Sequence, residues 1–285
     1  MSTEADALLV SATQRLAAVG NDTARLDARL LLAAACGVEP ADLTLGRVQT
    51  LQPAQRARFA RMIARRERNE PVGRILGYRE FWSLNFRLGP DTLEPRPDSE
   101  ALVEACLARL PERTAPYRMV DLGTGTGCLL LSILSERPQT KGVGVDIAPG
   151  ALRVARRNAV DLGLKPRARF QLGNWLTGIG ATFDLILSNP PYIPSADVLA
   201  LAPEVKDFDP ARALDGGPDG LGPYRILAAQ APARLKKGGW LAVEIGWDQG
   251  PRVADLFKSA GLTEVAVLPD LGGRDRVVVG LKAQA

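Results

Sequence analysis

The chain has 285 residues, of which 46% are hydrophobic and 24% are charged, and it contains no histidine. This composition excludes a disordered or fibrous chain, and the length favours one large domain with a smaller one. The formal net charge of +4 is too small to demand nucleic acid as a partner, and the missing histidine removes the commonest general base and metal ligand.

The cysteines and the hydrophobic runs bear on the compartment in which the protein works. Cys36, Cys106 and Cys128 lie far apart without a C-x-x-C pair, which argues against a disulfide framework and against a zinc site. The N-terminus lacks the regions of a signal peptide, and no run of about 18 uncharged apolar residues occurs. We therefore expect a cytoplasmic protein with no bound metal and no membrane partner.

Residues 5–68 have the spacing of helices, because their apolar residues recur every three or four positions. Thr23 and Pro53 are suited to helix starts, and Gly37 is suited to a helix end. This stretch predicts an N-terminal helical bundle over residues 1–70.

Residues 75–93 alternate aromatic and polar side chains, a pattern typical of a β-hairpin, and we predict a hairpin linker over residues 71–94. The preceding helical stretch ends in a cluster of arginines between residues 56 and 68. A solvated helix face is the first interpretation of such a cluster, and an acidic partner surface is the second.

From residue 95 onward, predicted strands alternate with predicted helices. The predicted strands cover residues 119–122, 142–146, 168–172, 183–187, 240–245, 264–268 and 276–281. The alternation predicts an α/β domain over residues 95–285, with a parallel sheet between two helical layers and the last two strands antiparallel at one edge. The segment 195–223 has no clear period, and a segment of this kind is often a substrate loop.

A glycine-rich turn follows the first of these strands and opens a helix; it consists of Gly123, Thr124, Gly125, Thr126 and Gly127. Its glycines let a ligand approach the backbone at the carboxyl edge of the sheet. The spacing is G-x-G-x-G, with Cys128 where a dinucleotide fingerprint has its third glycine, which disfavours a dehydrogenase. Asp146 ends the next strand and is placed to accept both ribose hydroxyls of S-adenosylmethionine or a similar cofactor.

The segment Asn189, Pro190, Pro191 and Tyr192 follows a later strand and reaches the same edge. The prolines stiffen the segment and offer no N–H donors, so the Asn189 side chain and carbonyl oxygens remain as acceptors for an –NH₂ group. Asn189 and Pro190 are thus the predicted catalytic acceptors, and all four residues are predicted to bind the substrate. Tyr192 is placed to close the pocket beside a sulfonium.

Three interpretations fit this segment. The substrate nitrogen belongs to an amide, or it is an exocyclic base amine of DNA or rRNA, which calls for a basic groove or an added recognition domain. The third is a non-catalytic binding module that has kept the fold; failure to bind S-adenosylmethionine would distinguish it.

Five segments, residues 70–82, 95–100, 121–127, 188–193 and 213–221, resemble in order the release factor glutamine methyltransferases, called PrmC or HemK. The resemblance covers nearly the whole chain. It implies a Rossmann-like class I S-adenosylmethionine-dependent methyltransferase domain, with a seven-stranded mixed sheet, behind an N-terminal helical domain that helps to recognise the protein substrate.

The resemblance also implies a reaction, namely methylation of the side-chain amide nitrogen (N5) of the glutamine in the Gly-Gly-Gln motif of class I peptide chain release factors. Direct nucleic-acid binding is not expected. A sibling family methylates a glutamine of a ribosomal protein and has Pro-Arg-Ser-Pro where this chain has Pro95-Arg96-Pro97-Asp98, which favours the release-factor branch.

Site residues follow from the same resemblance. The residues implied to contact S-adenosylmethionine are Gly123, Thr124, Gly125, Thr126, Gly127, Asp146, Trp175 and Asn189, and those implied to hold the glutamine are Asn189, Pro190, Pro191 and Tyr192. The chain departs from the family pattern at Glu94, Ser99 and Asn174.

Two weaker signals remain. Glu244, at the end of a strand, either shapes the pocket floor or is an ordinary buried carboxyl. Arg96 either orients the entry loop or pairs with Asp98 or Glu100.

Overall fold

A computed structural model describes residues 3–284, and the chain divides into two compact units, Met1–Tyr78 and Arg79–Ala285. Within the described part, none of the helices has both the length and the apolar character needed to cross a bilayer. Each unit has a hydrophobic core of its own.

The first unit consists of helices, as predicted. They are α1 (Glu4–Ala18), α2 (Ala24–Cys36), α3 (Pro40–Thr44), α4 (Pro53–Arg66) and α5 (Val72–Leu76). The apolar stripes of α1, α2 and α4 meet in one core, where Leu16, Leu31 and Ile63 are almost fully buried. Burial of these stripes stabilises helices that are too short to persist alone in water.

The start of α1 and the end of α2 illustrate how the sequence sets helix boundaries. At the start of α1, the Thr3 side chain accepts a hydrogen bond from the Asp6 backbone and Asp6 reciprocates, which forms a capping box. At the end of α2, Gly37 adopts the left-handed conformation, with φ 73° and ψ 34°, and its N–H donates to the Ala33 carbonyl.

Replacing Gly37 with alanine should lower the free energy of unfolding of the first unit by about 1–2 kcal/mol. An added Cβ at Gly37 meets no atom within 4 Å, so the loss comes from backbone strain alone. Urea denaturation followed by circular dichroism measures it. Gly37→Asn is the control, because asparagine adopts the left-handed conformation at a lower cost than alanine does; equal losses from the two changes would contradict the explanation.

Three arginines of the cluster between residues 56 and 68 form ion pairs within their own unit, whereas Arg58, Arg61 and Arg68 are exposed, as on a solvated face. Arg66 is buried and its Nε lies 2.7 Å from the Asp27 carboxylate of α2, while Arg65 pairs with Glu70. Arg56 pairs with Glu4 at 3.0 Å. For Arg66 the interpretation as a solvated face is wrong, because this side chain points into the bundle, where a buried partner compensates its charge.

The second unit combines nine strands with helices. The strands are β1 (Tyr78–Phe81), β2 (Leu84–Arg87), β3 (Arg118–Leu122), β4 (Lys141–Asp146), β5 (Ala168–Leu172), β6 (Phe183–Ser188), β7 (Leu235–Glu244), β8 (Thr263–Pro269) and β9 (Asp275–Leu281). The helices are η1 (Pro97–Ser99), α6 (Glu100–Ala108), α7 (Cys128–Glu136), α8 (Pro149–Asp161), η2 (Val198–Ala200), α9 (Pro203–Lys206), η3 (Ala211–Ala213), α10 (Gly222–Arg234) and α11 (Gly250–Ser259). Strands β1 and β2 form a separate two-stranded sheet.

The seven remaining strands form one mixed sheet in the order β5-β4-β3-β6-β7-β9-β8. Strands β3 to β7 are parallel, and β9 runs antiparallel to both β7 and β8. The predicted α/β fold, the strand number and the antiparallel pair at the edge are therefore confirmed.

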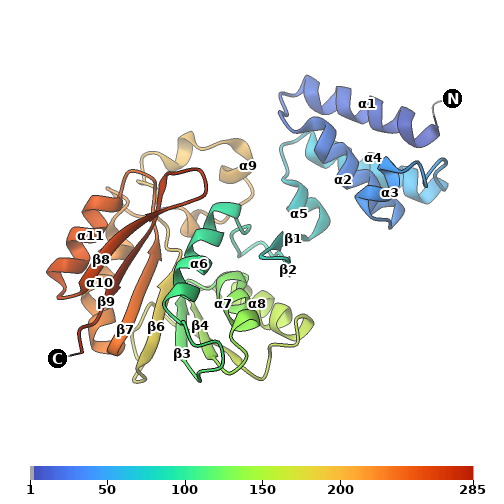
Figure 1. Cartoon of the computed structure of the whole chain (residues 1–285). Coiled ribbons are helices and arrows are strands. Elements are labelled where there is room, and N and C mark those ends of the chain that lie inside the picture. Colours follow the sequence, from blue (N-terminus) through green and yellow to red (C-terminus); the bar gives the residue numbers. More distant parts are fainter. Residues whose placement is uncertain (1–2, 285) are drawn as a thin grey trace. The chain divides into compact units, whose positions relative to one another are not determined.

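Helices cover both faces of this sheet (Figure 1). Alternate strand residues point to opposite faces, so Met119 packs in the core beneath α6 and α7, whereas Val120 packs in the core beneath α10 and α11. The central strands are consequently apolar on both sides, as buried parallel strands are.

Several boundaries differ from the sequence-based prediction. The stretch predicted as a hairpin linker, 71–94, begins with helix α5, and β7 begins at Leu235, five residues before the predicted strand. Helix α7 begins at Cys128 and not at Thr126, because Gly125 and Gly127 adopt positive φ angles of 55° and 81°, which no α-helix contains. Segment 195–223 includes three short helical turns, η2, α9 and η3, instead of having no regular structure.

The strand order places the site. Strand β3 lies between β4 and β6, so the chain leaves its carboxyl end toward one side of the sheet and later returns on the other side. Open α/β sheets bind ligands at such a switch point. The loops that follow β3, β4 and β6 therefore meet at one place.

Candidate active site

The carboxyl ends of β3 and β6 are tied together directly. The Ser188 hydroxyl donates a hydrogen bond of 2.6 Å to the Leu122 carbonyl. The glycine-rich turn begins directly after the last residue of β3, and Asn189 comes directly after the last residue of β6. The two segments that the sequence singled out are thus brought side by side.

The glycine-rich turn is held between two strands. The N–H groups of Gly123 and Thr124 donate to the Val145 carbonyl at 2.8 and 3.0 Å, and the Thr124 hydroxyl donates to Asp121 at 2.6 Å. Residues 123–126 line a cavity at this edge. Gly127 serves packing instead, because a Cβ there would lie 3.2–3.3 Å from side-chain atoms of α7 and α8.

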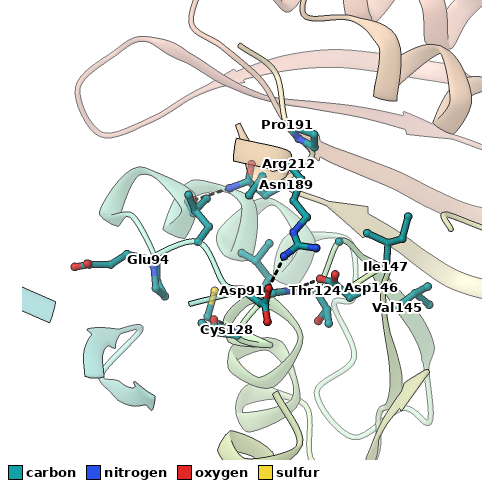
Figure 2. A pocket seen from close by; sticks show the side chains of 18 of the residues that line it. Asp91, Glu94, Thr124, Cys128, Val145, Asp146, Ile147, Asn189, Pro191 and Arg212 are labelled. Carbon is teal, nitrogen blue, oxygen red and sulfur yellow. Dashed lines mark hydrogen bonds and ion pairs between the residues drawn. The ribbon is translucent and has the colours of Figure 1, made fainter. Parts of the chain in front are cut away.

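Asp146 lines the same cavity at the end of β4, and both of its carboxylate oxygens accept backbone hydrogen bonds. Oδ2 accepts from Gly125 N at 2.9 Å, and Oδ1 accepts from Ala148 N at 2.8 Å. Figure 2 shows Asp146 together with Val145 and Ile147 beside the cavity. Each oxygen keeps a further lone pair, so the fixed carboxylate is suited to paired hydroxyl groups.

Trp175 lines the cavity in a strained conformation. Its φ of 53° lies in the left-handed region, which costs a residue other than glycine about 1–3 kcal/mol. Asn174 lines the cavity beside it. Trp175, Val145 and Ile147 give the cavity an apolar part next to the Asp146 carboxylate. An adenosine fits this set, because its base is flat and its ribose offers two hydroxyls.

Asn189 lies where this cavity meets a second one. The second cavity is lined by Leu93, Arg96, Asn189, Tyr192, Ile193, Leu201, Val205, Ala213, Leu214 and Glu244. Four of these residues, Leu93, Arg96, Asn189 and Ala213, line the first cavity as well. The Nδ2 atom of Asn189 donates to Ser99 Oγ at 3.2 Å, so that its Oδ1 is the end left to accept hydrogen bonds from a ligand.

The rest of the Asn-Pro-Pro-Tyr segment is divided between the cavities. Pro191 lines the first, Tyr192 lines the second, and Pro190 is buried and is not among the lining residues of either. Burial raises the pKa of the Tyr192 phenol, which keeps it neutral. The predicted position of the Tyr192 ring, next to a sulfonium, stays a prediction.

The glycines of residues 213–221 pack closely against the backbone of the Asn-Pro-Pro-Tyr segment. A Cβ at Gly216 would lie 2.8 Å from the Pro191 carbonyl oxygen, and one at Gly220 would lie 2.4 Å from the Tyr192 carbonyl oxygen. Hydrogen bonds from Ile193 N to Leu214 O and from Gly216 N to Ile193 O join the two stretches. The Gly-Gly and Asp-Gly pattern therefore permits a backbone contact that shapes the second cavity.

Two ion pairs that sequence reasoning missed join the 91–96 stretch to the loop after the Asn-Pro-Pro-Tyr segment. Arg96 pairs with Asp209 at 2.6 Å, not with Asp98 or Glu100. Arg212 points toward Asp91 and pairs with it at the first cavity (Figure 2). The partners are more than 110 residues apart in the chain, so no local pattern indicated either pair.

Two carboxyl groups beneath the site are deeply buried. Burial raises the pKa of Asp121 to about 7, against the hydrogen bond from Thr124. Burial likewise raises the pKa of Glu244 to about 7, against hydrogen bonding from Ser99 and the charge of Arg276. Both groups therefore change charge near neutral pH.

Family models match both units. The model described as the PrmC N-terminal domain matches residues 7–77, and the model described as a methyltransferase domain matches residues 114–258. Among solved structures, a methyltransferase from Pyrococcus furiosus aligns with a TM-score of 0.52 at 17% identity, covering 70% of this chain and 89% of its own, which shows the fold alone.

Curated relatives align over nearly the whole chain. The release factor glutamine methyltransferase of Rhodospirillum rubrum is 51% identical over 278 residues, which cover 98% of this chain and 85% of the relative. The protein of the same name from Cereibacter sphaeroides is 50% identical over 275 residues, which cover 96% of each chain. The chain belongs to the release factor glutamine methyltransferase family, as its resemblance to the PrmC proteins predicted.

Proposed function

We propose that this enzyme transfers a methyl group from S-adenosylmethionine to the side-chain amide nitrogen (N5) of the glutamine in the Gly-Gly-Gln motif of class I peptide chain release factors. One observation supports the proposal most strongly: Asn189 lines both cavities at their junction and offers Oδ1 as an acceptor there. A nitrogen bound by Oδ1 from the second cavity would face a methyl group presented from the first.

The first cavity would hold the cofactor. Asp146 would accept the ribose hydroxyls, Trp175 would pack near the adenine, and residues 123–126 would line the remainder. S-adenosylmethionine supplies an electrophilic methyl group when it is bound there. Asn174, in place of the usual acidic residue, would meet the adenine amino group through an amide.

The second cavity suits a glutamine side chain. Its walls include Leu93, Ile193, Leu201, Val205 and Leu214, which match the two methylene groups of glutamine. Arg96, the cation in its lining, is paired with Asp209 and so is not available to hold a phosphate in the way a nucleic-acid site would. An amide is therefore favoured over a base amine.

The amide nitrogen is a weak nucleophile, because resonance delocalises its lone pair into the carbonyl. Asn189 Oδ1 would accept one of its N–H bonds and help to point the lone pair at the methyl carbon; the Pro190 carbonyl, the second acceptor predicted from the sequence, would have to reach the amide from a residue that lines neither cavity. Bound S-adenosylmethionine would supply the methyl group and take up the electron pair of the bond that breaks, and the acceptors would stabilise the positive charge that grows on the amide nitrogen. One N–H proton then leaves to water, so the absent histidine is not needed.

The helical first unit would help to recognise the release factor, because the second unit already holds both cavities. Labelled S-adenosylmethionine tests the whole assignment. We expect label on the wild-type release factor and none on a release factor with Gln→Ala in Gly-Gly-Gln. Equal labelling of the two would contradict the proposal. Label on ribosomal protein or rRNA, but not on release factor, would indicate one of the alternative substrates.

A further inference from the structure

Glu244 has no place in the chemistry above, although it lines the second cavity. It is the last residue of β7, at the carboxyl edge of the sheet, and it is 2% exposed. Its Oε2 atom has no hydrogen-bond partner among residues 3–284. A carboxyl in this environment is costly for the fold, since burial disfavours its charged form.

The groups between Glu244 and Asn189 have a definite direction of hydrogen bonding. Ser99, which is 3% exposed, accepts through Oγ from Nδ2 of Asn189 at 3.2 Å. A hydroxyl that accepts one hydrogen bond still has its own hydrogen to donate. The Ser99 hydroxyl and the Asn189 amide both act on the Glu244 carboxyl as donors that lower its pKa. Asn189 thus donates to Ser99, and the hydrogen of the Ser99 hydroxyl is left to point toward Glu244, whose pKa both side chains lower.

We propose that Glu244 is a positioning residue that keeps the carbonyl end of Asn189 turned toward the substrate amide and strengthens it as an acceptor. A flipped Asn189 would present –NH₂ to the substrate –NH₂, which cannot bond. An acceptor carboxylate behind the –NH₂ end disfavours that flip. Its negative charge polarises the hydrogen bonds through Ser99, so that more negative charge lies on Oδ1 of Asn189, which faces the developing positive charge. The inference rests on the proposed function.

A purely structural role does not account for this carboxyl. Its nearby cation, Arg276, is shared with Asp270 and Asp98, at 3.2 and 3.3 Å. Because burial raises the pKa of Glu244 to about 7, the fold binds its proton more tightly than the unfolded chain does. Ionisation of Glu244 therefore lowers stability as the pH rises from its ordinary value to about 7. A neutral amide at this position should not destabilise the fold.

The test is the variant Glu244→Gln, which keeps the shape and removes the charge. We expect kcat for methyl transfer to a release factor to fall about tenfold or more, the scale by which a charged partner strengthens a hydrogen bond. The KM for release factor and the calorimetric Kd for S-adenosylmethionine should change by less than about threefold. Asp255→Asn is the control, since Asp255 is an exposed carboxylate of α11; its kcat should match the wild type.

Two further readouts separate positioning from folding. Thermal unfolding of Glu244→Gln at about pH 8 should occur at or above the wild-type temperature, since no buried charge remains. Ser99→Ala should reproduce the loss of kcat, and combining the two changes should add little, because both break the same chain of hydrogen bonds.

The pH profile gives an independent check. The wild-type kcat should rise with pH through about 7 as Glu244 loses its proton. In Glu244→Gln that rise should disappear. The other ionisable groups that act on Glu244 come from the elements packed around it, and they are Asp98, Cys128, Tyr192, Tyr224 and Arg276.

Each result decides the matter. A kcat of Glu244→Gln within threefold of the wild type overturns the inference, as does a loss of kcat that is matched by a clear fall in unfolding temperature. If the wild-type enzyme transfers no methyl group to a release factor, the proposed function fails and this inference fails with it. If the wild type transfers the group and Glu244→Gln does so equally well, only the inference fails.

Discussion

Replacing Asn189 with alanine should lower kcat for methyl transfer by about 10²–10³-fold, the usual effect of removing one preorganised transition-state hydrogen bond. The reason is geometric. Asn189 lines both cavities, and its Oδ1 is the end left free by the hydrogen bond to Ser99. Without it, the substrate amide would lose an acceptor for the N–H bond whose polarity grows during transfer. Single-turnover assays with labelled S-adenosylmethionine would measure the chemical step directly.

Asn189→Asp is the sharper companion of that change. It preserves one oxygen and the volume of the side chain, but it replaces the –NH₂ end that donates to Ser99 and faces Glu244. We expect a comparable loss, because two acceptors would then oppose each other. Lys141→Ala, at the opposite edge of the sheet, should leave kcat unchanged. A kcat of Asn189→Ala within threefold of the wild type would remove Asn189 from the mechanism.

Replacing Asp146 with alanine should weaken binding of S-adenosylmethionine by about 10- to 100-fold, the value of one or two hydrogen bonds to a charged group. The carboxylate is already oriented by Gly125 N and Ala148 N, so its loss removes the ribose acceptors and leaves two backbone donors without a partner. Isothermal titration calorimetry would measure the Kd.

The control for Asp146 is Asp161→Ala, at the end of the helix that follows it. Asp161 pairs with Arg87 and Arg157 at the surface and is not among the residues that line the cavity. Its Kd should equal that of the wild type. If Asp146→Ala also bound S-adenosylmethionine as the wild type does, the ribose assignment would be wrong, and the cofactor would have to bind elsewhere in the cavity.

Local patterns predicted the fold well, because helices and strands each leave a simple spacing of apolar residues in the sequence. Apolar residues three and four apart made the first unit helical, and short apolar runs between helices made a parallel sheet. The boundaries were less certain. Helix α7 begins two residues later than predicted, since the positive φ angles of Gly125 and Gly127 belong to the turn and not to the helix.

The sequence by itself determined which segments would meet. The glycine-rich turn and Asn189 each follow a strand and Asp146 ends one, and the carboxyl ends of neighbouring parallel strands lie at one edge of the sheet. The stiffness or glycine content of the backbone at these positions is a local property, so the sequence alone was enough to predict that the segments bind ligands. The resemblance to the family included these segments, and the alignment with curated relatives over nearly the whole chain confirmed the membership.

Only the tertiary structure decided which side chains stand behind those segments. Ser99 lies 90 residues from Asn189 along the chain, yet it accepts the hydrogen bond from Nδ2 that leaves Oδ1 of Asn189 facing the cavities. Arg96 pairs with Asp209 and not with its own neighbours. Such contacts depend on how distant elements pack, because a charged or polar group finds its partner in space and not along the sequence. The sequence shows the Asn-Pro-Pro-Tyr segment, and only the fold orients the Asn189 oxygen as a hydrogen-bond acceptor.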